Sequence, residues 1–313
     1  MPEPEDHTGV ESSAAPESSS DANTPRSASR RRFLRRLLPG GLAVSAPTAV
    51  YAYAIEPDRI QVTRVDVPIA GLPPGAAGLR IGHISDTHCD SPRAVRRTAA
   101  AARLLGEQRP DVVFLTGDYI THAPHARIAA AADALSPLAR TPRGVFAVLG
   151  NHDWWSGDPD HVSDALRKVG FTVLRNRSAE IGDTGVYAVG LEQRCDSLQN
   201  PDVALKNVPD YAVKLLLIHE PDYADEAPAG FALQFSGHSH GGQVCIPGLP
   251  PLIVPRFSRR YPVGLRESRN HLVFTTRGVG MIGPKFRLFC PPEVAVIRLL
   301  SAESTTINRP ESP

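Results

Sequence analysis

The stretch Leu149-Gly150-Asn151-His152-Asp153 places an amide and an imidazole side by side at the end of an apolar run, Val145 to Leu149. The run has the character of a buried strand, and it stops abruptly at polar side chains that can bind metals. Loops that follow buried strands hold functional residues on a rigid support. The sequence therefore predicts a site at the mouth of this strand, with Asn151 and His152 in it.

Four other polar clusters end apolar runs in the same way: Asp86-Thr87-His88, Gly117-Asp118, His219-Glu220 and Gly237-His238-Ser239-His240-Gly241-Gly242. Taken singly each is weak evidence, because an Asp-x-His is more often a turn and a Gly-Asp carries almost no information. Five in order, each after an apolar run, indicate that they converge on one two-metal centre. Carboxylate and imidazole ligands suit Mn, Zn, Fe or Ni.

Apolar runs alternate with amphipathic segments through the first half of the chain. We expect strands at 79–85, 112–116, 145–149 and 171–174, and helices at about 92–108, 126–138 and 161–169. Ser91-Pro92 marks the start of the first helix, as N-cap and as proline at the first helical position. This βα alternation predicts a parallel sheet covered by helices.

The second half is strand-rich, with strand-like runs at 186–189, 213–218, 231–235, 243–246, 271–275 and 294–299. It predicts a second sheet packed on the first within one domain. The loops 247–255 and 256–262 are rich in proline and arginine, and we expect them to rim the site.

The composition is that of a chain with a sizeable core, with 42% apolar residues, 21% charged residues and a formal net charge of +1. This balance gives no indication of a nucleic-acid partner. The four cysteines, Cys89, Cys195, Cys245 and Cys290, lack the CxxC spacing of a zinc knuckle. Free thiols are the simpler interpretation, and a disulfide stays open if the protein is exported.

The N-terminal segment predicts export. Residues 1–28 have almost no large apolar side chain, so a disordered leader is expected. Ser29-Arg30-Arg31-Arg32-Phe33-Leu34-Arg35 then resembles a twin-arginine signal, which implies the twin-arginine translocase as a partner. The apolar stretch 37–54 is interrupted by proline and glycine and ends in Ala52-Tyr53-Ala54, a possible cleavage site; an uncleaved anchor is the alternative. The expected organisation is a leader (1–54), a domain (55–303) and a flexible tail (304–313), placed in the periplasm or on the outer face of the cytoplasmic membrane.

Across Leu79 to Leu300, the ordered motifs Asp86-x-His88, Gly117-Asp118, Gly150-Asn151-His152-Asp153, His219 and Gly237-His238-x-His240 resemble the calcineurin-like metallophosphoesterases. His238 to Gln243 and Thr276-Arg277-Gly278-Val279-Gly280 resemble a branch of exported bacterial phosphodiesterases. The resemblance implies an α/β fold, a four-layer α/β/β/α sandwich of two packed mixed sheets. It also implies two divalent metal ions, of the Mn, Zn or Fe type, and a phosphoester substrate.

The resemblance further implies a role for each residue that matches a motif. Asp86, His88 and His240 would bind the first metal, Asn151, His219 and His238 the second, and Asp118 would bridge the two. A metal-bridging hydroxide would attack phosphorus, and His152 would protonate the leaving alkoxide. Asp153 would either orient His152 or cap its own loop, and Arg277 is a candidate phosphate contact.

Other polar and aromatic residues receive simpler interpretations. His83 lies inside a strand pattern and is expected in the core or behind the ligands. His122 and His125 are expected on a surface loop. Trp154 and Trp155 could wall the substrate cleft or pack the loop.

The predicted function is hydrolysis of an envelope or lipid-linked phosphoester, with a phosphodiester as the first expectation. Two alternatives remain at this point. One is a pyrophosphate hydrolase of the UDP-2,3-diacylglucosamine type, as in lipid A synthesis, and the other is a metal-binding envelope protein without turnover. Oligomeric state and metal identity have no readable signal in the sequence.

Overall fold

The computed structural model describes residues 46–121, 125–156 and 158–302. The leader motif at 29–35, the tail at 304–313 and His122 lie outside the described residues. The chain divides into two units, Met1–Pro47 and Thr48–Pro313, and the second contains both sheets. Within the described residues, no helix is both long and apolar enough to cross a membrane.

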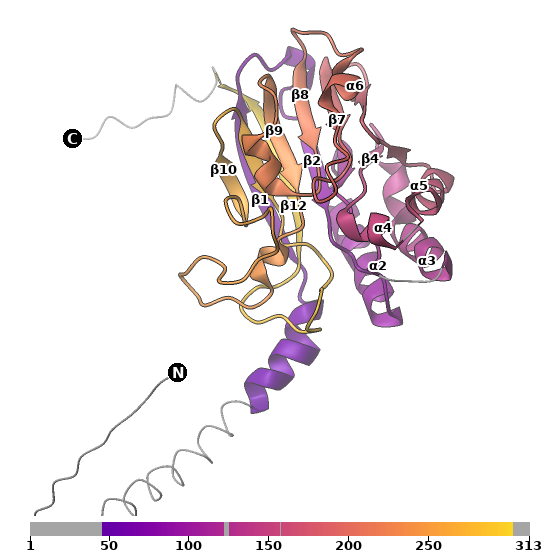
Figure 1. The fold of residues 1–313 in the computed structure, drawn as a ribbon, viewed down its shortest axis with the longest axis vertical. Coiled ribbons are helices and arrows are strands. Elements are labelled where there is room, and N and C mark those ends of the chain that lie inside the picture. The colour runs from indigo at the N-terminus through magenta and orange to yellow at the C-terminus, as the bar shows by residue number, and fades with distance from the viewer. Residues whose placement is uncertain (1–45, 122–124, 157, 303–313) are drawn as a thin grey trace, which may run out of the picture. The chain divides into compact units, whose positions relative to one another are not determined.

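The first sheet has six strands in the order β1-β12-β2-β3-β4-β5. Neighbours from β2 to β5 pair in parallel, whereas β12 runs antiparallel to β2 and parallel to β1. Helices α2 (Pro92–Glu107), α3 (His125–Leu135) and α5 (Pro159–Lys168) lie together on one side of it (Figure 1). The strand bounds are β1 Gln61–Ile69, β2 Arg80–Ile84, β3 Val112–Leu115, β4 Val145–Ala147, β5 Thr172–Val173 and β12 Glu293–Ser301.

The second sheet also has six strands, in the order β10-β11-β9-β8-β7-β6. Its four central strands are parallel, and β6 and β10 are antiparallel edges. A short helix, α6 (Pro201–Leu205), and a 3-10 turn at Pro221–Asp225 cover its outer face. The strand bounds are β6 Arg177–Glu180, β7 Val186–Gly190, β8 Val213–Leu217, β9 Phe231–Ser236, β10 Gly264–Glu267 and β11 Leu272–Thr275.

Three apolar layers hold these elements together. Side chains such as Leu105 and Leu115 fill the space between the helices and the first sheet. Phe114 and Phe235 meet between the sheets, with ring centroids 4.9 Å apart, and fully bury their rings there. A smaller layer around Leu216 lies under α6. The predicted α/β/β/α sandwich is therefore confirmed.

Helix α2 begins where the sequence predicted. Ser91 has an extended backbone, and its hydroxyl accepts a hydrogen bond from the backbone N–H of Ala94 at 3.2 Å. Pro92 follows at the first helical position, where a missing N–H has no cost. The helix then packs its buried face, which includes Ala101 and Leu105, on the sheet.

The expected strand at 243–246 is wrong. Only an isolated bridge joins Val244 to Leu288 there. Gly241, Gly242 and Gln243 all have positive φ, so the chain turns away before a strand can form. The loop beyond it, through Pro247, is exposed instead.

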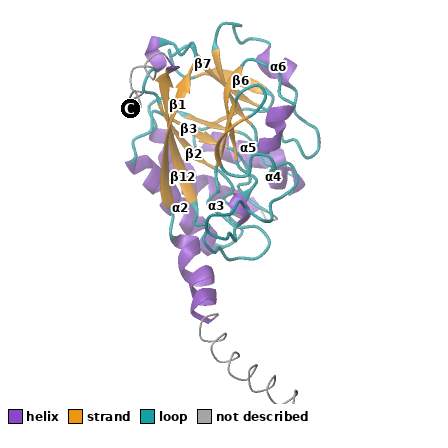
Figure 2. Ribbon diagram, turned by 90° about the vertical axis from the view of Figure 1, so that its left-hand side faces the viewer, coloured by secondary structure: helices purple, strands orange, loops and turns teal. Residues whose placement is uncertain are grey.

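The parallel strands determine where the polar clusters lie. In the first sheet β2, β3 and β4 each end just before one of them, and in the second sheet β8 and β9 do the same. The carboxyl ends of parallel strands share one edge of a sheet. Figure 2 shows both sheets in one layered body, with loops gathered below the ends of the strands.

Candidate metal centre

Two groups of buried acidic and histidine side chains meet at the carboxyl ends of the strands. The first contains Asp86, His88, Asp118 and His240, with one ligand atom from each within 4.8 Å of all the others. In it, His88 Nε2 lies 3.2 Å from His240 Nε2 and 3.6 Å from Asp118 Oδ2. Two imidazole nitrogens and two carboxylates so close together form a donor set suited to a divalent cation.

The second group contains Asp118, His219 and His238. His219 Nε2 lies 3.1 Å from Asp118 Oδ2 and 3.9 Å from Asp86 Oδ1. Asp118 belongs to both groups, so its carboxylate lies between two potential cation positions.

Asn151 completes the second group. It is the first residue of α4 (Asn151–Trp155), and it lines the same pocket as Asp118 and His238. Its side-chain oxygen is buried and has no hydrogen-bond partner within the described residues. A buried carbonyl left without a donor is costly, and a cation bound between these groups would satisfy it. The residues present therefore fit a pair of divalent metal ions.

Hydrogen bonds behind the ligands fix which nitrogen each imidazole presents. His219 Nδ1 lies 2.6 Å from the carbonyl oxygen of Thr116, and His88 Nδ1 lies 2.6 Å from Thr121 Oγ1. Both rings therefore direct Nε2 at the centre. His238 donates from Nε2 to the carbonyl oxygen of Arg256 at 2.8 Å, which leaves Nδ1 as its free nitrogen. Such partners orient a metal-binding histidine and set its tautomer.

The ligand residues have a backbone conformation that non-glycine residues rarely adopt. Asp86, His88, Asp118, His238 and His240 have φ values of 54°, 43°, 56°, 66° and 51°. Non-glycine residues seldom occupy this left-handed region, and they persist there when the surrounding structure holds them. The sharp reversal after each strand directs these side chains inward.

Glycines permit the loops to approach one another. A Cβ on Gly150 would lie 2.2 Å from Asp118 Oδ1, and one on Gly117 would lie 2.3 Å from the backbone nitrogen of Gly150. Both distances are far below van der Waals contact. The glycines of Gly117-Asp118 and Gly150-Asn151 thus bring the bridging carboxylate and the amide to one place.

Burial and neighbouring charges separate the protonation states of the histidines. Burial lowers the pKa of His88 to about 4, and burial with the nearby His88 holds the pKa of His240 well below its usual value. Burial also opposes the charged form of His219, but the Asp118 carboxylate outweighs it and holds the pKa of His219 well above its usual value. In turn, His219 lowers the pKa of Asp118 although burial acts to raise it. The raised pKa favours the protonated form of His219 in the metal-free protein, and a cation would compete with that proton.

A pocket of about 400 Å³ opens over this centre. His152 lies in its wall, and the backbone N–H of His152 donates to Asp118 Oδ1 at 2.9 Å. The His152 ring packs edge-on against Trp155, with centroids 5.1 Å apart. Arg256 and Phe257 also line the pocket, as the loop prediction for 256–262 anticipated. A substrate in this pocket would lie beside both groups of ligands.

Asp153 caps its loop. Its Oδ2 accepts from the backbone N–H of Asp118 at 2.8 Å and of Gly150 at 2.9 Å, and its Oδ1 accepts from Tyr119 at 2.9 Å and Ile120 at 3.4 Å. This geometry supports the capping alternative. Asp153 ties the Asp118 loop to the start of α4, and so acts on the position of the bridging carboxylate.

Arg277 does not line the pocket. Its guanidinium donates instead to Glu293 at 3.2 Å and to Gln61 at 3.3 Å. The prediction that Arg277 contacts a phosphate finds no support in this placement. The sequence could not show that Arg277 pairs with Glu293, because Glu293 lies on another strand, β12.

The other histidines and tryptophans considered in the sequence lie in different parts of the structure. His83 is buried between the sheets, where Nε2 pairs with Thr116 Oγ1 at 2.8 Å and the ring packs on Phe235, so its expected place in the core is confirmed. Trp155 lines the pocket, whereas Trp154 donates to Glu192 at 2.9 Å. His125 is the first residue of α3, so the expected loop is helix there. Sequence reasoning did not find Thr121 or the carbonyl of Arg256 as partners of the ligands, because a backbone carbonyl has no sequence signal.

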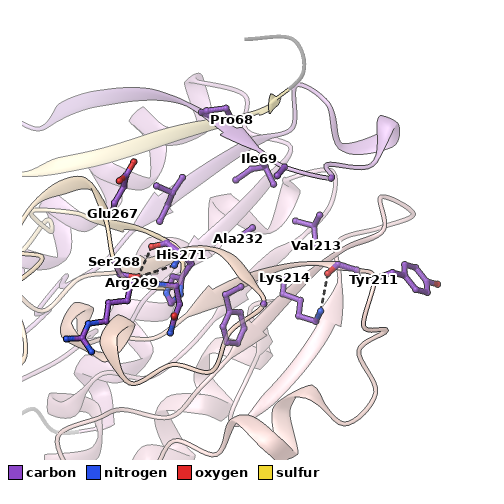
Figure 3. Close-up of a pocket in the computed structure, with 17 residues that line it drawn as sticks. Pro68, Ile69, Tyr211, Val213, Lys214, Ala232, Glu267, Ser268, Arg269 and His271 are labelled. Carbon is purple, nitrogen blue, oxygen red and sulfur yellow. Dashed lines mark hydrogen bonds between the residues drawn. The ribbon is translucent and has the colours of Figure 1, made fainter. Parts of the chain in front are cut away.

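A second and larger hollow, of about 610 Å³, lies where β8, β9 and β11 begin rather than where they end (Figure 3). Lys214 Nζ is held there by the carbonyl oxygens of Asp210 and Ala212, and Ser268 bonds to His271. None of the metal-type ligands described above lines it. The larger of the two pockets is therefore not the one that contains the candidate metal ligands.

The chain matches known proteins over most of its length. Residues 79–242 match the family model described as calcineurin-like phosphoesterase. The chain is 31% identical over 290 residues to the metallophosphoesterase YkuE of Bacillus subtilis (strain 168), covering 87% of this chain and 98% of that protein. It is 32% identical over 286 residues to the phosphodiesterase YaeI of Escherichia coli (strain K12), covering 87% and 99%. It is 27% identical over 319 residues to the UDP-2,3-diacylglucosamine pyrophosphatase LpxG of Chlamydia muridarum (strain MoPn / Nigg), covering 82% and 95%.

Proposed function

The chain belongs to the calcineurin-like metallophosphoesterase family of hydrolases, and on that premise we propose that it is a phosphodiesterase acting on an envelope or lipid-linked phosphoester. The observation that carries the proposal is the position of Asp118 in both groups of ligands, directly under a pocket that contains His152. Asp86, His88 and His240 would hold one cation, and Asn151, His219 and His238 the other.

When bound, two divalent cations would activate water and stabilise the charge that develops on the phosphoryl oxygens. The protein's own residues do the rest. The backbone N–H of His152 is tied to Asp118 Oδ1, its ring packs against Trp155, and the residue lines the pocket. An imidazole there can give a proton to the departing alkoxide oxygen near neutral pH.

Arg256 and Phe257 in the pocket wall would position the substrate. The Arg256 guanidinium lies over the Phe257 ring, 4.5 Å from its centroid, and both residues line the pocket. An arginine held in this way presents a planar set of donors that suits a phosphate. We assign to Arg256 the phosphate contact that the sequence assigned to Arg277.

The test is hydrolysis of bis(nitrophenyl) phosphate and of nitrophenyl phosphate by metal-stripped protein, before and after Mn or Zn is restored. Cleavage of the diester that depends on metal, and falls at least about 100-fold in His152→Ala and in Asp118→Asn, is the expected result. Tyr211→Ala, a change at a 91% exposed position, is the control and should keep full activity. Two metals bound per chain with no turnover of either ester would favour the metal-binding protein without turnover.

A second candidate is a pyrophosphate hydrolase of the UDP-2,3-diacylglucosamine type, supported by the 27% identity to LpxG. Its substrate would also join a phosphate to a lipid. Direct competition between that nucleotide lipid and the diester separates the two, because a pyrophosphatase would cleave the nucleotide lipid with much the higher kcat/KM.

We also propose that the protein reaches its place of action through the twin-arginine route. The motif Ser29 to Arg35 supports this, and folded export would let the metals be loaded before translocation. Replacing Arg30 and Arg31 by lysine should leave the protein in the cytoplasm. Export of that variant at the normal level would refute the route and leave the hydrolase proposal intact.

A further inference from the structure

A loop beside the pocket exposes apolar side chains that nothing in the described chain covers. Residues 244–255 read Val-Cys-Ile-Pro-Gly-Leu-Pro-Pro-Leu-Ile-Val-Pro, without a charged residue. Ile246 is 49% exposed, Leu249 55%, Leu252 65% and Ile253 82%. Soluble proteins seldom expose a continuous apolar run of this kind, and where they do it marks an interaction surface.

Two further segments extend this surface. The backbone N–H of Cys245 donates to Leu288 at 2.9 Å, which places the loop beside the segment 286–290. That segment in turn contacts the helical turn Tyr51–Ile55, because the backbone N–H of Arg287 donates to the carbonyl oxygen of Ala52 at 3.0 Å. We call the combined surface the apolar rim and define it by its most exposed large side chains, Tyr53, Ile246, Leu249, Leu252, Ile253 and Phe289. The loops and the helical turn Tyr51–Ile55 meet at the lower end of Figure 1.

The two loop segments of the apolar rim, 244–260 and 281–290, carry basic side chains and no acidic ones. Neither 244–260 nor 281–290 contains an aspartate or a glutamate, whereas Arg256, Arg259, Arg260 and Lys285 are exposed there. Arg260 pairs with Asp225, and Lys285 lies 3.9 Å from Asp90. Arg256 and Arg259 therefore give these segments most of their net positive charge. Apolar side chains flanked by basic ones fit the interface of a bilayer that contains anionic lipid.

The backbone of the loop also suits a membrane interface. Pro247, Pro250, Pro251 and Pro255 have no N–H group, so the loop brings fewer unpaired donors into a poorly hydrated region.

We propose that the apolar rim docks this protein on an anionic bilayer, so that the pocket faces the lipid headgroups. The loop runs directly from the apolar rim into the pocket wall at Pro255, Arg256 and Phe257. The carbonyl of Arg256 also bonds to the ring of His238 at 2.8 Å. A phosphoester held at the membrane surface would therefore reach His152 without leaving the bilayer. The substrate class, a phosphoester on a membrane lipid, rests on the proposed function; the docking does not.

The first experiment measures binding of the full chain to vesicles of phosphatidylcholine, with and without a minority of phosphatidylglycerol. Replacing Leu249 and Ile253 together by aspartate should lower the partition constant by about tenfold or more for each side chain removed from the interface. Val203→Asp changes a valine that is 58% exposed on α6, close to the 55% of Leu249, and should bind as the parent does. Far-ultraviolet dichroism and the melting temperature of each variant control for folding.

A second measurement reports on the loop even if the leader alone holds the chain on the membrane. Tryptophan fluorescence of Leu249→Trp, after subtraction of the parent signal, should shift to shorter wavelength and be quenched by brominated lipid. Tyr211→Trp, at the other end of the strands, should show neither effect. The absence of both effects at Leu249, or self-association that Leu249→Asp abolishes without any vesicle binding, would overturn the proposal. Because vesicle binding needs no turnover, His152→Ala should bind normally, and docking and catalysis can therefore fail separately.

Discussion

Asp153 shows how one side chain can hold a metal site together without being a ligand. It is fully buried, and its two carboxylate oxygens accept four backbone N–H groups from the loops that carry Asp118 and Asn151. A cluster of backbone donors in the interior is stable only while an acceptor faces it.

Asp153→Asn should therefore destabilise the metal-free protein by about 2–4 kcal/mol, because the amide replaces one acceptor by a donor that faces other donors. Urea unfolding of the metal-free protein measures this, since bound metal adds its own stability. Asp164→Asn is the matched control: Asp164 is 74% exposed and pairs with Arg167, and should change the free energy of unfolding by about 0.5 kcal/mol or less. Equal effects of the two changes would contradict the capping role.

The histidines of the centre should differ in charge before metal is added. The Asp118 carboxylate raises the pKa of His219 against the effect of burial, whereas burial lowers the pKa of His88 to about 4. A raised pKa means that the charged form persists above the usual titration range, so at pH 7 His219 should be imidazolium and His88 neutral. Nitrogen-15 spectra of histidine-labelled, metal-free protein show this directly, with His219→Gln for assignment.

Addition of Zn should convert the His219 signal to that of a neutral, metal-bound ring. Because proton and metal compete for Nε2, metal affinity should fall as the pH is lowered. A neutral His219 ring at pH 7 in the metal-free protein would show that burial outweighs the Asp118 charge.

At the scale of the elements, the strands end where their loops must cross closely. Gly117 has a φ of 93°, and a Cβ there would lie 2.3 Å from the backbone nitrogen of Gly150. Gly117→Ala should cost about 2 kcal/mol or more and weaken metal binding, because the β3 and β4 loops must separate. Gly106→Ala, in α2 with nothing within 4 Å, should leave stability unchanged or raise it by up to about 1 kcal/mol. Thermal unfolding with and without Mn measures both changes, and an unchanged metal effect in Gly117→Ala would contradict the link between these loops and the centre.

The elements that carry the centre were predictable because buried parallel strands are continuous apolar runs. Val112 to Leu115 and Leu215 to Leu217 show this pattern, and each precedes a ligand loop. The edge strands β1, β6 and β10 were not predicted, since half-exposed strands such as Arg177–Glu180 contain charged and polar residues throughout. The loop after His240 was wrongly predicted as a strand because the sequence shows Gly241 and Gly242 but not their left-handed backbone conformation.

At the scale of the whole molecule, the last strand returns to the first sheet, and the order of the sequence does not predict this. β12 pairs with β1 along nine residues and with β2 along four, so it lies between the two. No local pattern specifies such a partner, since Glu293–Ser301 reads simply as an apolar strand. The placement of Glu293 beside Arg277 follows from the same pairing.

β12 should therefore be indispensable to the fold although it contributes no ligand. Val294, Ile297 and Leu299 are fully buried, and their burial contributes about 5–9 kcal/mol, comparable with the whole stability of a typical domain. β1 has no other partner in its sheet and would be lost with β12. A chain that ends at Pro292 should unfold without cooperativity in urea, whereas a chain that ends at Ala302 should melt as the parent does.

Two point changes on the same strand give a graded form of this test. Ile297→Ala should cost about 2–5 kcal/mol, and Arg298→Ala, which removes an exposed pair with Asp66, about 1 kcal/mol or less. Both should leave metal stoichiometry unchanged, because the ligands come from other strands. A cooperative transition in the chain that ends at Pro292 would show that the fold holds without the last strand of the first sheet.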